Sequence, residues 1–178
     1  TNRSKISNYF AMQYTHFNDD LNSFLHNVTL VANFENSEIN SEDLAYFAPA
    51  VKSWKRSFSL KGAVKGPVDN LSGKKLHIES GNTLIDGDLA LRGLPDFSNT
   101  YIELKSNDLQ TNYGDLVSLI PSLRRVRQPQ LAKLGYIRFK GTINGFINDF
   151  VAFGTINTNL GNVVADLNMK IPANKIPV

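Results

Sequence analysis

Three histidines and one pair of aspartates are the residues of this chain whose types could do chemistry. His16, His26 and His77 are scattered, and the first two lie ten residues apart, so no helix face brings them together as metal ligands. The Asp-Gly-Asp run at 86–88 lacks the further carboxylates of a calcium loop, which favours a tight turn. No nucleophile stands beside an acid–base pair at motif spacing. We therefore expect no enzymatic activity, no metal and no cofactor.

Basic residues gather in one stretch that contains no acidic residue, between Leu116 and Asn148. The stretch includes Arg124, Arg125, Arg127, Lys133, Arg138 and Lys140. One interpretation of the first four is a solvated loop after a helix, whose C-terminal end favours basic residues. The other is a basic patch that binds lipid headgroups or an acidic partner.

Composition excludes several classes of protein. The net charge of +3 over 178 residues is mild, and aromatic residues are not interleaved with basic ones, so we expect no nucleic-acid partner. The absence of cysteine excludes disulfides, thiolate zinc sites and a cysteine nucleophile. No apolar run approaches the roughly 18 residues of a membrane span. Because the chain starts with threonine, we expect it to be cut from a longer protein, with any anchor or signal outside it.

An internal repeat organises the chain. The stretch 58–71 recurs as 137–150, with Lys61, Gly62 and Gly66 answered 79 residues later by Lys140, Gly141 and Gly145. Upstream, 43–51 recurs as 115–123 at a spacing of 72 residues, so the second copy carries an insertion of seven residues, which falls between Arg124 and Leu134. Because one supersecondary unit is used twice, we expect the chain to stack as an array. Glycines inside the repeated strands indicate a bend.

The elements of each copy follow from hydrophobic periodicity. Helical stripes at 44–51 and 116–123 each contain a proline, so each helix should be short or kinked at Pro49 and Pro121. Alternating residues after each helix predict strands, most clearly at 163–171, and turn residues separate them. Such strands form an antiparallel meander with one apolar and one polar face.

These elements predict a mainly β protein with short helices, whose repeated antiparallel β-meander units stack into an elongated, curved β-groove. We expect an N-terminal strand and short helix at 1–28, a first unit at 29–99 and a second unit at 100–178, all in one continuous sheet. One short helix per unit leaves apolar surface uncovered, which indicates a groove for acyl chains. The predicted wall consists of Phe58, Leu60, Val64, Ile137, Phe139, Ile143, Val151, Phe153, Leu167 and Met169. A closed core beneath the helices remains the alternative.

Two further stretches carry a family resemblance. The glycine-containing cassette followed by 145–161 and by Asp-Leu-Asn-Met-Lys-Ile-Pro at 166–172 resembles the TamB family, the translocation and assembly module proteins of Gram-negative bacteria. The stretch 81–95 is similar to the form of this family found in Bacteroidetes. The likeness covers roughly Asn27 to Pro172, and it depends on the order of the motifs.

The resemblance implies a role in the cell envelope. It implies an interior piece of a periplasmic protein that is anchored in the inner membrane, reaches the outer membrane and works with a β-barrel assembly protein of the TamA or BamA type. It also implies kinship with AsmA-like and bridge-like lipid-transfer proteins, and phospholipid acyl chains as ligands. We therefore expect a non-enzymatic groove for phospholipid transport, outer-membrane protein assembly, or both. The alternative is a structural β-solenoid spacer or adhesin-type repeat with a closed core.

Overall fold

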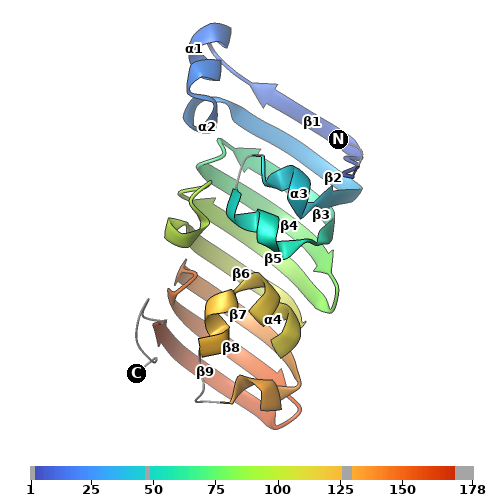
Figure 1. The fold of residues 1–178 in the computed structure, drawn as a ribbon, viewed down its shortest axis with the longest axis vertical. Helices are drawn as coiled ribbons and strands as arrows, with labels where there is room; N and C mark the ends of the chain where they lie inside the picture. Colours follow the sequence, from blue (N-terminus) through green and yellow to red (C-terminus); the bar gives the residue numbers. More distant parts are fainter. Residues whose placement is uncertain (1–2, 47–48, 126–129, 171–178) are drawn as a thin grey trace.

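The chain forms one open antiparallel sheet of nine strands, which follow each other in sequence order (Figure 1). The computed structural model describes residues 3–46, 49–125 and 130–170. The strands are β1 (Asn8–Gln13), β2 (Thr29–Asn40), β3 (Ser57–Gly66), β4 (Asn70–Ser80), β5 (Thr83–Arg92), β6 (Tyr101–Asn112), β7 (Tyr136–Phe146), β8 (Asp149–Thr158) and β9 (Gly161–Lys170). The predicted class, mainly β with short helices in an antiparallel meander, is confirmed.

The helical segments are short and lie in the links between strands. They are α1 (Phe17–Asn22), α2 (Phe24–Asn27), α3 (Ser41–Leu44), η1 (Pro49–Trp54), η2 (Phe97–Asn99), α4 (Tyr113–Leu119), η3 (Pro121–Arg125) and η4 (Leu131–Leu134). Pro49 and Pro121 each begin a 3-10 helix after an α-helix has ended, because proline fits the first helical position but not the interior. Both helices are therefore short, as the prolines predict.

The order of elements occurs twice. The first set is β2, α3, η1, β3, β4 and β5, and the second is β6, α4, η3, η4, β7, β8 and β9. β2 and β6 each end in an asparagine, Asn40 or Asn112, whose side chain accepts a hydrogen bond from a backbone N–H in the first turn of the following helix. The additional segment η4 lies in the region of the seven-residue insertion.

Strand register places apolar side chains on one face, the inner face. In β3, half-buried Phe58, Leu60 and Val64 alternate with exposed Ser59 and Lys61. Directly paired residues share a face, so rows of partners can be followed across the sheet. One inner-face row is Leu60, Ile78, Ile85, Leu109, Phe139, Ile156 and Val163. A second is Phe10, Ala32, Val64, Gly73, Leu89, Leu104, Ile143, Ala152 and Leu167.

A line of bulges and small residues crosses the sheet between these two rows. The register shifts in five successive strand pairs, from β2·β3 to β6·β7, and a bulge bends its strand. The line continues through the pairs Ser106 with Gly141, Gly141 with Gly154 and Gly154 with Ala165. At Gly141, φ is +155° and an added Cβ would lie 2.1 Å from the Phe153 carbonyl oxygen. Only glycine tolerates this approach of two strands.

Candidate functional site

Eight of the ten predicted wall residues lie on the inner face. Phe58, Leu60, Val64, Ile137, Phe139, Ile143, Leu167 and Met169 occupy inner-face positions of β3, β7 and β9. The placement of the other two on this wall is wrong, because Val151 pairs with Asn144 and Phe153 pairs with Thr142, on the opposite, outer face. Odd- and even-numbered positions of β8 both carry apolar residues, so alternation alone does not show which of them face inward. The repeat shows it, because it matches Phe150 to the inner-face residue Leu71.

Sequence reasoning also missed much of the inner face. Several rows run through β4, β5, β6 and the inner positions of β8, from which no wall residue was predicted. The missed residues include Ile78, Ile85, Leu89, Leu104, Leu109 and Ile156. Pairing each alternating strand with the repeated cassette would have found them.

The inner face is only partly covered. Of the eight wall residues on it, Phe139 is buried at 5% exposure, Leu167 is exposed and the rest are half-buried. Among the described residues, twelve hydrophobic side chains are buried and fifteen large ones are exposed.

Side chains from the links between strands pack over the inner face at two places, and we call each of these groups a cover. The first cover lies in the first unit. Trp54, at the end of η1, contacts the inner-face ring of Phe58 with ring centroids 5.8 Å apart. It also contacts Phe97 of η2 at 5.3 Å. Both pairs are edge-to-face, the arrangement that aromatic quadrupoles favour.

A second cover crosses the inner face in the second unit. Val117 of α4 and Leu123 of η3 are buried together. The half-buried residues packed against them are Tyr113, Leu116, Ile120, Leu131 and Met169. Because Met169 is an inner-face residue of β9, this cover packs against the inner face of the sheet. Figure 1 shows α3 and α4 in front of the sheet on the same side.

An ion pair joins the two covers. Arg56 Nη2 donates to Asp115 Oδ1 at 2.6 Å, and the Asn82 backbone N–H donates to Asp115 Oδ2 at 2.8 Å. Burial opposes ionisation of this carboxyl, but the bonds from Arg56 and Asn82 outweigh it and hold the pKa of Asp115 below its ordinary value. The repeat matches Asp115 to Asp43, and Asp43 likewise accepts a hydrogen bond from a residue far earlier in the chain, the hydroxyl of Ser4.

The predicted basic patch is described in part. Arg124 lies in η3 and Lys133 in η4, and both side chains are exposed. Arg125 ends η3, and neither its side chain nor Arg127 belongs to the described part of the chain. The two described members are therefore available to solvent beside the second cover.

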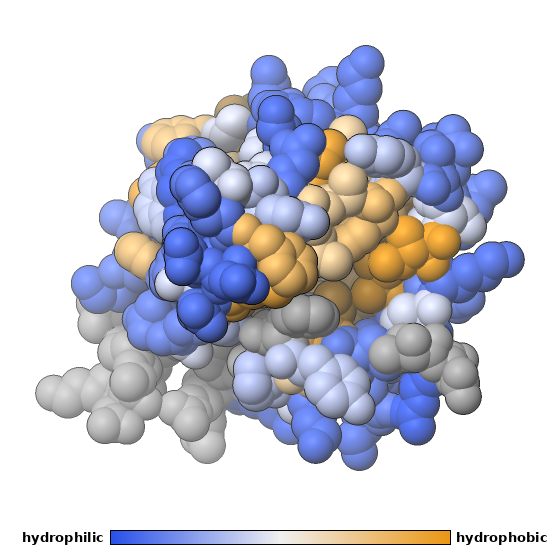
Figure 2. All heavy atoms as spheres, turned by 90° about the horizontal axis from the view of Figure 1, so that it is seen from above, coloured by the Kyte–Doolittle hydropathy of each residue, from blue (hydrophilic) through white to orange (hydrophobic). Residues whose placement is uncertain are grey.

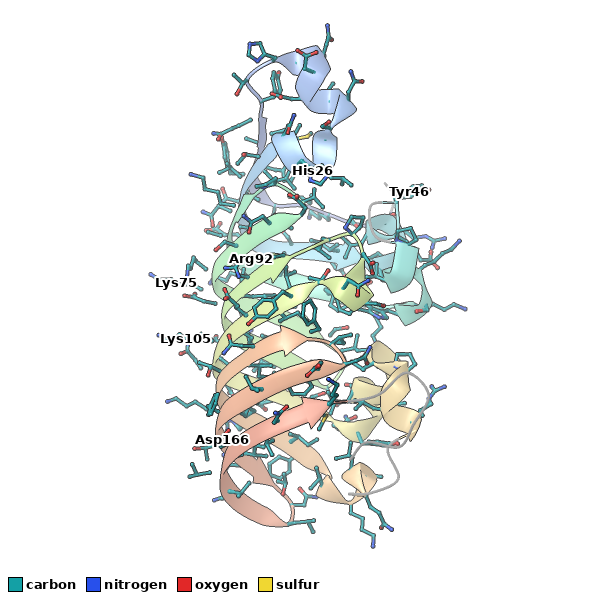
Figure 3. All side chains as sticks on the ribbon, turned by 90° about the vertical axis from the view of Figure 1, so that its left-hand side faces the viewer. His26, Tyr46, Lys75, Arg92, Lys105 and Asp166 are labelled. Atoms are coloured by element: carbon teal, nitrogen blue, oxygen red, sulfur yellow. The ribbon has the colours of Figure 1, made fainter. Side chains whose placement is uncertain are left out.

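Most side chains of the outer face are polar and many are paired with one another, although Val151, Phe153 and Val164 in β8 and β9 are apolar. Cross-strand ion pairs join Lys74 to Asp88 and Arg92 to Glu103, and Arg138 donates two hydrogen bonds to Asp108. His77 lies here too, 3.3 Å from Asp86 and 3.0 Å from Glu79. Figure 3 shows Lys75, Lys105 and Asp166 on the side of the sheet away from α3 and α4. In the described ranges no three histidine or acidic side chains are grouped as a metal ion would require.

The inner face is exposed at both edge strands of the described part of the sheet. β1 and β9 are the edge strands, and their inner-face side chains Phe10 and Val163 are 43% and 54% exposed. Figure 2 looks down the long axis from the β1 end and shows apolar residues gathered inside a polar rim. We call this apolar, partly covered inner face from β1 to β9 the trough.

No protein-family model, curated protein or solved structure matched the chain. The described segments contain no helix with the length and apolarity needed to cross a bilayer.

Proposed function

We propose that this chain is a non-enzymatic trough that holds phospholipid acyl chains, in a protein of the TamB type. The observation that carries the proposal is the continuity of the inner-face rows. One row runs from Phe10 in β1 to Leu167 in β9 and the other from Leu60 in β3 to Val163 in β9, and Phe10 and Val163 are exposed at the edge strands. With strands about 4.8 Å apart, nine strands give a trough about 38 Å long. A flexible hydrocarbon chain fits such a surface without specific polar partners.

Acyl-chain binding has a sufficient driving force. Each CH2 group removed from water contributes about 0.8 kcal/mol, so a chain of a dozen buried groups is strongly favoured before the cost of ordering it. The half-buried state of Leu60 and Ile143 leaves apolar area for such contacts. In this proposal the ligands are membrane phospholipids, and the protein works in the periplasm between the two membranes.

The outer-membrane partner belongs to the same proposal. A β-barrel assembly protein of the TamA or BamA type would work with the chain, and lipid supply or barrel assembly would be the outcome. The exposed Arg124 and Lys133 support a role beside anionic headgroups, because their charges flank the second cover.

A closed-core spacer is the second candidate. The two covers favour it, because Trp54 and the Val117–Leu123 cluster each cross the inner face. In that case the trough would be dry and the protein would act through its surface.

Site-specific photocrosslinking distinguishes the two candidates. A benzophenone amino acid replaces Leu60, on the inner face, or Lys61, its neighbour on the outer face, in cells whose phospholipids carry radioactive phosphate. Leu60 suits the probe better than Phe139, because Phe139 is buried. We expect labelled lipid at position 60 and none at position 61. Equal labelling at both positions, or crosslinks only to protein, would favour the spacer.

A further inference from the structure

Trp54 lies between the two margins of the sheet, which are the two sides on which its strands end. It belongs to the link between β2 and β3, whereas Phe97 belongs to the link between β5 and β6. In a meander these two links lie at opposite strand ends, and a ten-residue strand spans about 33 Å. The ring centroids of Trp54 and Phe97 are nevertheless 5.3 Å apart. The two margins therefore meet above the inner face at this pair of rings.

Hydrogen bonds hold the backbone on both sides of the pair. On one margin, the Ser41 N–H donates to the Arg56 carbonyl at 2.8 Å and the Arg56 N–H donates to Ser41 Oγ at 3.0 Å. On the other margin, Thr100 is fully buried and its hydroxyl donates to the Asp96 carbonyl at 2.8 Å. With both backbones held in this way, separation of the rings would require rotation of their side chains and not movement of the chain.

We propose that Trp54 and Phe97 form a gate across the trough, which an acyl chain opens by parting the two rings. This inference rests on the proposed function and names the point of control within it. Both rings are half-buried, and one edge-to-face contact is weak enough to break and re-form. Contacts with the acyl chain then replace the contact between the rings. The second unit contains no tryptophan, so the gate belongs to the first unit.

The fluorescence of Trp54 reports directly on the gate, because it is the only tryptophan in the chain. The full chain is titrated with stearate or with 9,10-dibromostearate, whose bromines quench tryptophan on contact, and bound fatty acid is measured separately by equilibrium dialysis. We expect both fatty acids to bind and only the brominated one to quench. Binding without quenching would overturn the gate and leave the trough intact, whereas no binding of either would overturn both proposals.

Variants of Phe97 test whether the ring contact resists entry. Phe97→Ala should speed the onset of quenching in stopped flow about 2- to 10-fold, because it removes one edge-to-face contact from the closed state. Phe97→Leu keeps most of the side-chain volume and should give a smaller acceleration, and it serves if the alanine variant does not fold. Phe153→Ala, on the outer face, should leave the rate unchanged. Unchanged or slower quenching in the Phe97 variants would overturn the gate.

Discussion

Replacing Gly141 by alanine should force β7 away from β8 in the middle of the sheet. Gly141 has φ of +155°, and its Cβ would lie 2.1 Å from the Phe153 carbonyl oxygen and 2.7 Å from the Gly154 Cα. Both neighbours are backbone atoms of the next strand. They can give way only if the two strands separate.

The expected loss of stability has two parts. Holding an L-residue in this backbone conformation costs on the order of 1–3 kcal/mol. Separating the strands weakens adjacent ladder bonds and strains their packing, at a further cost of about 1–3 kcal/mol. A total of about 4 kcal/mol is a large share of the roughly 5–15 kcal/mol that stabilises a typical domain. At about 2–4 °C per kcal/mol for a chain of this length, Tm should fall by roughly 8–16 °C.

Gly161→Ala is the matched control. Gly161 has a similar φ of +130°, but no heavy atom lies within 4 Å of its added Cβ. It should therefore lose only the backbone part, about 1–3 kcal/mol. Thermal melts followed by circular dichroism compare the two variants with the parent chain. Equal losses in both variants, or no loss in Gly141→Ala, would refute the argument from close strand approach.

Two further changes test the links between sheet and covers. Asp115→Asn should cost about 1–3 kcal/mol of unfolding free energy at pH 7, because the Arg56 charge loses its partner. The folded pKa of Asp115 is depressed, so its contribution is complete above the unfolded pKa of about 3.9 and is lost as pH falls through the folded value. Urea titrations should therefore show a smaller difference at pH 3 than at pH 7, and an equal difference would contradict the ion-pair assignment. Asn112→Ala removes the N-cap of α4 and should lower the free energy of unfolding, measured in urea, by about 1 kcal/mol. Asn112→Asp keeps a capping oxygen and serves as the control. Equal free energies for the parent chain and both variants would count against the cap.

The sequence predicted the elements that local periodicity and repetition specify. Alternation located β3, β7 and β9, and the repeat related 115–123 to 43–51. Periodicity does not identify the cap of α3, which is Asn40, the acceptor of the bond from the Glu42 N–H. Periodicity also does not specify the length of β2, because the bulge after Phe34 interrupts the alternation although β2 continues to Asn40.

The arrangement of the strands across the sheet was not predictable in the same way. The cassette glycines indicated a bend, but a bend in one strand does not say whether neighbouring strands bend at the same level. The register shows that they do, since Gly62 pairs with Phe34, Leu76 with Gly87, and Gly87 with Ser106. This alignment is a property of the strand pairing and not of any single segment.

Adding one repeated unit to another lengthens the trough without closing it. The first cover joins Trp54, from the link between β2 and β3, to Phe97, from the link between β5 and β6, and the second cover comes from the link between β6 and β7. β9 occupies in the second unit the place that β5 occupies in the first, and β5 pairs with the next unit through β6. The inner-face rows pass through that junction without a polar break, since Leu89 pairs with Leu104 and Leu91 with Ile102. An apolar surface that is continuous across the junction of two units is what movement of a hydrocarbon chain along the sheet requires, whereas a closed core needs no such continuity.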